Sequence, residues 1–235
     1  CLSRGLGDVY KRQSMMWSMD EAIGNVIDAL KENNQYDNTI IYFLSDNGAA
    51  MSNNASPFPY KGWKGNQFEG GIKTPMIMTW KNKIKSNTQF DGFISALDIF
   101  KTSLEVSNVN DDLMANADGK NIMNYLNDNI IQNENLFWRK DKMATVRSGN
   151  YKLIRLNDTS TVLYNIENNF FEDLDLKLIE PSIHDSLFKL LSVWEDRLID
   201  PNWIENKDWN IVTEMIYEDL MANKNIRAVS PKDLN

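Results

Sequence analysis

Apolar residues near the start of the chain recur at steps of three or four, which predicts one amphipathic helix over residues 14–34. Its apolar stripe consists of Met16, Met19, Ile23, Val26, Ile27 and Leu30. A polar cluster ends this pattern, and residues 39–44 (TIIYFL) then form a short, continuous apolar run. We interpret that run as a strand buried on both faces, as in a parallel sheet. A helix followed by a buried strand is half of an α/β unit.

A long segment without regular periodicity comes next at residues 45–74, rich in Gly, Asn, Ser and Pro. Loops of this length are uncommon inside compact domains and are often functional. The elements expected after it are a strand at 75–80, a helix at 94–106 and a short helix at 121–126. In the second of these, we expect Leu97, Phe100 and Leu104 to face inward, with Ile94 as a further candidate.

The pattern changes after about residue 131. Short apolar runs separated by turn residues predict an antiparallel meander, with strands at 136–139, 142–147, 151–155 and 162–165. Two helices are expected after it, at 182–199 and 209–223. The fold class is therefore α/β, followed by a small antiparallel sheet with a packed C-terminal helix.

Composition and charge restrict which partners the protein can bind, but they say little more about its fold. The 235 residues are 42% hydrophobic and carry a net charge of -8, which supports a real core and argues against a nucleic-acid partner. No apolar run approaches the roughly 20 residues that span a bilayer. With one cysteine, no internal disulfide forms. Neither the redox compartment nor the oligomeric state can be read from these totals.

The first thirteen residues, CLSRGLGDVYKRQ, share no periodicity with the helical pattern that begins at residue 14. We expect residues 1–13 to be a non-native leader and exclude them from fold reasoning. Cys1 is therefore not expected to act as a nucleophile.

The strongest chemical signal is Asp46-Asn47-Gly48, directly after the strand at 39–44. In open α/β sheets, ligands bind at the carboxyl ends of strands. A carboxylate and an amide oxygen suit a hard cation such as Ca²⁺ or Mg²⁺. The same three residues also make an ordinary turn, so the motif alone leaves both readings open.

A second signal is the glycine-rich segment 61–65 (KGWKG), followed by Glu69-Gly70-Gly71. A lysine flanked by glycines can present its ammonium to an oxyanion. The spacing is not that of a phosphate-binding P-loop. Without the first signal, a solvated loop lysine is the simpler reading.

Taken together and in order, these segments resemble the formylglycine-dependent sulfatases, an alkaline-phosphatase-like family. The resemblance includes residues 19–24 (MDEAIG) in the preceding helix, 37–41 (DNTII) at the strand entry and 163–168 (LYNIEN) downstream. It covers residues 14 to about 200. It implies that residues 14–131 are the C-terminal part of the catalytic α/β domain and residues 132–235 an α+β subdomain.

The resemblance also implies roles for individual residues. Asp46 and Asn47 correspond to calcium ligands, and Lys64 to the catalytic lysine that contacts the substrate sulfate. Lys61 and Trp63 are expected to line the same substrate loop. Lys73 stands where the family usually has arginine.

The aromatic residues divide by position. Tyr60 and Trp63 belong to the substrate loop, where aromatic rings often stack on sugars. Trp203 and Trp209 could stack on sugars as well, but for these two core packing against the last helices is the favoured interpretation.

The implied activity is hydrolysis of sulfate esters, with a sulfated small molecule or polysaccharide as substrate, by an enzyme exported to the periplasm or beyond. In this family a formylglycine attacks sulfur, while calcium, lysine and histidines assist. The nucleophile motif, an early Asp-Asp pair and the histidines precede the segment seen here, and His184 lies in a C-terminal helix. We therefore expect a C-terminal fragment that is inactive and unstable alone. The alternatives are a phosphate or phosphonate ester hydrolase of the same superfamily and a non-catalytic carbohydrate-binding remnant.

Overall fold

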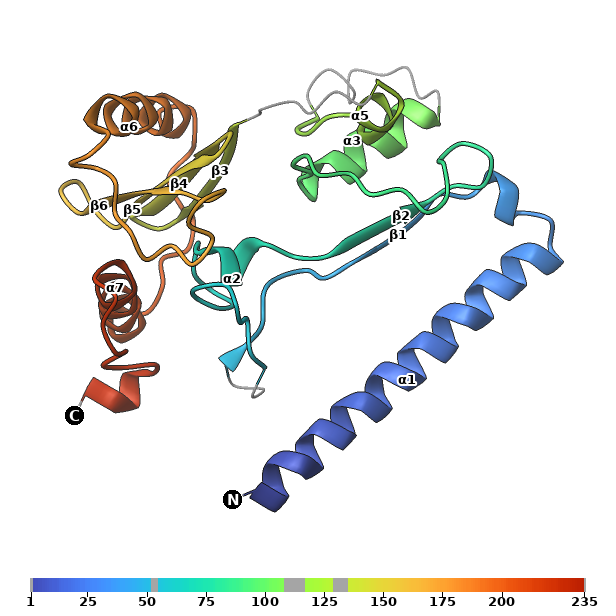
Figure 1. Ribbon diagram of the computed structural model, residues 1–235, viewed down its shortest axis with the longest axis horizontal. Coiled ribbons are helices and arrows are strands. Elements are labelled where there is room, and N and C mark those ends of the chain that lie inside the picture. The colour runs from blue at the N-terminus through green and yellow to red at the C-terminus, as the bar shows by residue number, and fades with distance from the viewer. Residues whose placement is uncertain (1, 52–54, 108–116, 129–134, 235) are drawn as a thin grey trace. The chain divides into compact units, whose positions relative to one another are not determined.

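The computed structural model describes residues 2–51, 55–107, 117–128 and 135–234 (Figure 1). The chain divides into two compact units: unit 1 comprises residues 1–44 and 76–89, and unit 2 comprises 45–75 and 90–235. None of the described helices is long and apolar enough to cross a membrane. The proposed domains 14–131 and 132–235 stay a prediction.

Unit 1 consists of a long helix and a two-stranded ladder. Its elements are α1 (Leu2–Glu32), the 3₁₀ helix η1 (Tyr36–Asn38), β1 (Ile41–Leu44) and β2 (Met76–Thr79). Helix α1 begins twelve residues before the expected start, so most of the segment that we set aside is helical. Cys1 lies outside the described residues.

The prediction of a doubly buried parallel strand is wrong. Strand β1 pairs with β2 in the antiparallel direction, with Ile41 opposite Thr79 and Leu44 opposite Met76. Among the described residues β1 has no second strand neighbour, and the Phe43 side chain is 43% exposed. A short apolar run reveals that a strand is hydrophobic but not the direction or number of its neighbours.

Three short helices open unit 2: α2 (Glu69–Ile72), α3 (Leu97–Val106) and α5 (Ile122–Asp128). Helices α3 and α5 meet through polar side chains, since the Asp98 carboxylate accepts from the Lys120 amide at 2.9 Å and the Thr102 hydroxyl accepts from the Ile122 amide at 2.9 Å. The expected inward face of α3 is wrong, because Leu97 is 57% exposed. Phe100 is exposed as well.

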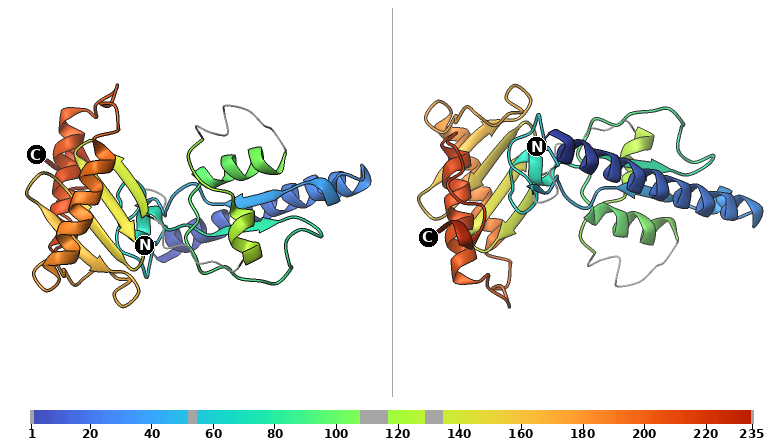
Figure 2. Two further views of the ribbon diagram at one scale, coloured as in Figure 1. Left: turned by 90° about the horizontal axis from the view of Figure 1, so that it is seen from above. Right: turned by 90° about the horizontal axis from the view of Figure 1, so that it is seen from below.

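The antiparallel meander is confirmed. Strands β3 (Asn135–Lys140), β4 (Met143–Ser148), β5 (Tyr151–Arg155) and β6 (Thr161–Asn165) pair in sequence order, each antiparallel to the next. The elements after them are α6 (Pro181–Glu195), α7 (Lys207–Met221) and the 3₁₀ helix η3 (Pro231–Leu234). Figure 2 shows the meander in yellow beside the orange and red helices.

Both faces of this sheet are covered, because successive side chains of a strand point to opposite faces. One face packs Leu153 against α6, in a cluster that includes Leu191. The other packs Ile154 against Tyr217 of α7, and Phe68 from the long loop between β1 and β2 joins this second cluster. The loop therefore inserts into the core of the C-terminal sheet.

The two C-terminal tryptophans do not pack as expected. Trp203 is 88% exposed and Trp209 is 44% exposed. Trp203 precedes α7 on an irregular segment that does not reach the sheet clusters.

Candidate functional site

The Asp46–Asn47 turn leaves the end of β1 and presents two oxygen donors. Ser45 begins the turn, and its hydroxyl donates to the Asn47 carbonyl at 2.9 Å. The Asn47 amide nitrogen donates to the Gly48 carbonyl at 2.9 Å, which leaves the side-chain Oδ1 as an acceptor. Asp46 is exposed, and within the described residues no group donates a hydrogen bond to its carboxylate.

Glycines hold this turn against the substrate loop. The Gly48 amide donates to the Gly71 carbonyl at 3.0 Å. A Cβ at Gly48 would lie 1.9 Å from the Gly70 carbonyl oxygen, and a Cβ at Gly71 would lie 2.1 Å from the Asn66 carbonyl oxygen. Any side chain at these positions would force the two segments apart, so the glycines are needed for the close approach.

Lys64 is tied to the same turn by its backbone. Its amide donates to the carbonyl of Ala49 at 2.9 Å, two residues beyond Asn47. The Lys64 side chain is exposed, and no acceptor for its ammonium occurs in the part of the chain that the structure describes. The structure thus brings the backbones of the predicted metal ligands and the predicted sulfate lysine together.

Lys61 points toward the end of α7 and the loop between β6 and α6. Its ammonium donates to the Leu220 carbonyl at 2.8 Å, to the Asn223 side chain at 2.5 Å and to the Glu172 carbonyl. Burial lowers the pKa of Lys61, outweighing the attraction of Glu172 and Asp173. These contacts give Lys61 an anchoring role at the end of α7. Its contact with substrate stays a prediction.

Trp63 is also turned toward the protein. Its indole packs against the core cluster that contains Phe68, and its amide donates to the Asn66 side chain at 3.3 Å. Its role in substrate binding stays a prediction.

A buried ionic network lies directly behind the loop, and sequence reasoning missed it. Lys152 of β5 is fully buried and donates to Glu69 at 2.9 Å and to Glu172 at 2.8 Å. The Glu172 carboxylate also accepts from the Glu69 amide at 2.8 Å, and Arg147 lies 3.4 Å from Glu69. The only sequence signal is a lysine inside the apolar run YKLIRL, at 151–156.

The two glutamates of this network differ in acidity. Burial raises the pKa of each carboxyl, but at Glu69 the charges of Lys152 and Arg147 outweigh it and lower the pKa. At Glu172 burial outweighs Lys152 and the pKa is raised. The network therefore holds one firmly ionised acid at the start of α2, directly before the glycines of the site.

The residues present fit a calcium site only in part. A carboxylate oxygen from Asp46 and the Oδ1 of Asn47 are the hard donors that Ca²⁺ prefers. A calcium ion usually takes 6–8 such oxygens. Within the described ranges no group of three or more His, Cys, Asp or Glu residues is placed to hold a metal.

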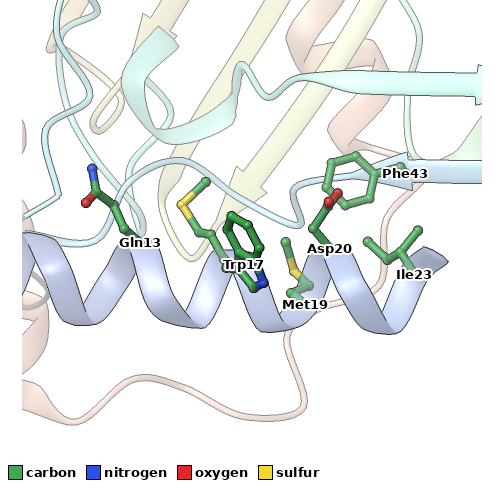
Figure 3. Close-up of a pocket in the computed structure, with 7 residues that line it drawn as sticks. Gln13, Trp17, Met19, Asp20, Ile23 and Phe43 are labelled. Carbon is green, nitrogen blue, oxygen red and sulfur yellow. The ribbon is translucent and has the colours of Figure 1, made fainter. Parts of the chain in front are cut away.

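Two further features share no residue with this candidate site. His184 contacts Thr161 at 2.9 Å and Asp185 at 3.0 Å, as expected of a satisfied helical histidine. A hollow of about 410 Å³ in unit 1 is lined only by α1 residues and Phe43, and it contains none of the predicted site residues (Figure 3).

Comparisons with known proteins agree on one family. Residues 8–109 match the family model described as Sulfatase. A protein of Escherichia coli described as an uncharacterised sulfatase is 37% identical over 117 residues, which cover 48% of this chain and 20% of that protein. Human N-acetylgalactosamine-6-sulfatase is 27% identical over 139 residues, covering 57% and 27% respectively.

The comparison with solved structures defines the fold class. The crystal structure of Ps i-CgsB in complex with k-i-k-neocarrahexaose superposes with a TM-score of 0.75 at 28% identity, covering 89% of this chain and 49% of that one. This likeness places the chain in the alkaline-phosphatase-like α/β class. Through residues 8–109 the chain is similar to the sulfatase family. It spans less than half the length of each of these relatives. The family match begins inside the segment that we expected to be a leader.

Proposed function

We propose that this chain supplies the calcium-binding and sulfate-binding loops of a sulfuric ester hydrolase that acts on sulfated carbohydrates. Asp46 and Asn47 are the proposed calcium ligands, and Lys64 is the proposed catalytic lysine. The match of residues 8–109 to the sulfatase family model supports the reaction class. Relatives whose names or titles contain a sulfated sugar or a carrageenan oligosaccharide support the substrate class.

The observation that carries this proposal is the hydrogen bond from the Lys64 amide to the Ala49 carbonyl. Together with the bond between Gly48 and Gly71, it holds the backbone of Lys64 beside the turn that carries the Asp46 carboxylate and the Asn47 amide oxygen. A metal site and a cation held on one rigid backbone suit an anionic ester bound between them.

The chemistry expected of these residues is electrostatic. The Asp46 carboxylate and the Asn47 amide oxygen would hold Ca²⁺, which when bound supplies positive charge to the sulfate oxygens. The Lys64 ammonium, as a compact point charge, would neutralise further charge as it shifts toward the leaving oxygen. Asn47 suits a hard cation, whereas a zinc-type phosphatase would favour histidine there.

We further propose that residues 1–235 do not hydrolyse esters alone. The sequence has one cysteine, which lies outside the described residues, and one histidine, which is held by Thr161 and Asp185. General acid–base catalysis and a covalent nucleophile both need further groups within hydrogen-bonding reach.

The test begins with the gene upstream of the codon for Ser14. We expect a reading frame that encodes Cys-x-Pro-Ser-Arg or Ser-x-Pro-Ser-Arg and an early Asp-Asp pair. The protein encoded by that longer frame should hydrolyse 4-nitrophenyl sulfate in the presence of Ca²⁺ and lose at least about 100-fold in rate as Lys64→Ala. Lys85→Ala, which changes an equally exposed lysine, is the matched control and should keep its rate.

Two outcomes would overturn this proposal. Preferred hydrolysis of 4-nitrophenyl phosphate would indicate the phosphoesterase alternative. A frame without a nucleophile motif, combined with glycan binding but no turnover, would indicate a carbohydrate-binding remnant.

A further inference from the structure

Two adjacent phenylalanines stand exposed on the loop between β6 and α6. Phe170 is 37% exposed and Phe171 is 43% exposed, and their ring centroids lie 4.1 Å apart. The Tyr60 ring from the substrate loop meets Phe170 edge-on at 6.4 Å, with 76° between the planes. Tyr60, Phe170 and Phe171 together form an aromatic cluster. The aromatic cluster joins two segments that are distant in sequence and exposes apolar rings to solvent.

The fold imposes this exposure. Glu172, directly after the pair, is fully buried in the ionic network with Lys152 and has a left-handed backbone at φ 55°. Its amide donates to the Asn169 carbonyl at 3.0 Å, and the Asn169 side chain accepts from the Asp173 amide at 3.3 Å. The two rings cannot turn inward unless these contacts break. A left-handed non-glycine residue costs energy and persists only where its surroundings fix it.

A cation borders the aromatic cluster. The Lys73 ammonium lies 4.7 Å from the centroid of the Tyr60 ring. Lys73 ends α2, whose Gly71 carbonyl binds the Gly48 amide beside Asn47. The aromatic cluster and the proposed calcium turn are thus connected through one four-residue helix.

We infer that the aromatic cluster and Lys73 form a subsite that binds a neighbouring sugar unit of a sulfated polysaccharide. This inference rests on the proposed function and names its substrate more closely. Sugar rings present C–H faces that pack on aromatic rings, and their sulfate groups pair with an ammonium. Polar groups beside apolar rings are typical of a small-molecule site.

Rigidity favours this reading over an accidental surface patch. Binding usually costs free energy for ordering side chains and loops, and a loop that is already anchored avoids part of that cost. The buried contacts of Glu172 and the hydrogen bonds of Asn169 provide that anchoring. Exposed apolar patches on rigid elements are also the usual form of interaction sites.

The test is calorimetric titration of the 235-residue chain with a sulfated galactan hexasaccharide and with its desulfated counterpart. Phe171→Ala should weaken binding of both sugars by about 5- to 10-fold, because it removes a stacking ring. Lys73→Gln should weaken binding of the sulfated sugar alone, by about 5-fold. The matched controls are Trp203→Ala, an exposed aromatic outside the cluster, and Lys85→Gln. Both controls should bind as the unaltered chain does.

Equal affinities for Phe171→Ala and Trp203→Ala would overturn the subsite. So would light scattering in which Phe171→Ala changes self-association while sugar affinity is kept, since the surface would then belong to contacts between copies of the chain. If Lys64→Ala weakens binding of the sulfated sugar but Phe171→Ala does not, the proposed function stands and the subsite falls. The reverse pattern would keep the subsite and remove the sulfate role of Lys64.

Discussion

Lys152 carries the most unusual environment of any residue near the site. It is a strand lysine with no exposed surface, held between Glu69 and Glu172. A buried charge is tolerated only when it is paired and hydrogen-bonded. Because Glu69 opens α2 and Glu172 supports the two phenylalanines, one ammonium supports both the proposed catalytic loop and the proposed subsite.

Removing this ammonium should be strongly destabilising. Lys152→Met leaves Glu172 buried without its cation and Glu69 with Arg147 alone, and we expect it to lower the free energy of unfolding by about 3–5 kcal/mol. Urea denaturation followed by tryptophan fluorescence measures this change. Lys142→Met, in the exposed turn between β3 and β4, is the control and should shift stability by less than about 0.5 kcal/mol. A loss at Lys152 no larger than at Lys142 would mean that the network contributes little.

At the residue scale, the sequence singles out the candidate ligands, whose roles stay predictions, but it does not reveal the residues that support their loop. Asp46, Asn47 and Lys64 stand out because their motif is local and contiguous. The partners that fix the loop, such as Lys152 and Glu172, come from distant segments. A charged residue in a strand is normally interpreted as solvent-facing, so burial of Lys152 is visible only once the sheet is covered on both faces.

At the element scale, local signals fixed the meander and missed the pairing in unit 1. Turn residues such as Ser148-Gly149-Asn150 mark where β4 ends and β5 begins. Such a short connection produces an antiparallel hairpin. No comparable signal exists for β1 and β2, which are separated by a long loop. Their direction depends on tertiary structure, which periodicity does not encode.

The C-terminal end of α7 contains an ion pair whose contribution to stability should depend on pH. Asp219 accepts from the Arg227 amide at 2.9 Å and from its guanidinium at 2.8 Å. Burial alone would raise the pKa of Asp219, but the hydrogen bonds and charge of Arg227 outweigh it, so the pKa lies below its ordinary value of 3.8. A lowered carboxyl pKa stabilises the folded state above the ordinary pKa and loses that effect as pH falls through the folded pKa.

We therefore expect Asp219→Asn to be less stable than the unaltered chain near neutral pH. The difference should shrink as the pH falls below 3.8, where Asp219 becomes protonated in the folded chain too. Urea unfolding at several pH values measures it. Asp200→Asn alters an exposed carboxylate and should show no such pH dependence. A constant difference across the acid range would contradict the role assigned to Arg227.

At the scale of the whole molecule, stability is unevenly distributed between the two units. The C-terminal sheet is covered on both faces by apolar clusters, whereas α1 leaves Met15, Met16 and Trp17 largely exposed. Helix formation in water depends mostly on packing of an apolar face. Sequence patterns predict the order of the elements in both units. They do not predict that the sheet is buried while α1 is exposed, because burial depends on which other elements pack against each face.

Hydrogen exchange should reveal the contrast directly. Amides of α1 from residue 9 onward should exchange well before amides of β4 to β6, because their helix opens without disrupting a core. Mass spectrometry of peptides from both regions at one pH measures this. Equal protection of α1 and the sheet would show that the chain unfolds as one cooperative body and would contradict the expected instability.

The hydrogen bonds of Lys61 also determine when, during synthesis on the ribosome, the loop that carries Lys61 and Lys64 can be anchored. Its acceptors Leu220 and Asn223 lie 159 and 162 positions further along the chain. At about 5–20 residues per second, a ribosome needs roughly 8 to 32 s to travel that far. During this interval the segment that carries Lys64 has been synthesised but lacks the helix end that secures it. The first loop of the site is therefore among the last parts of the molecule to mature.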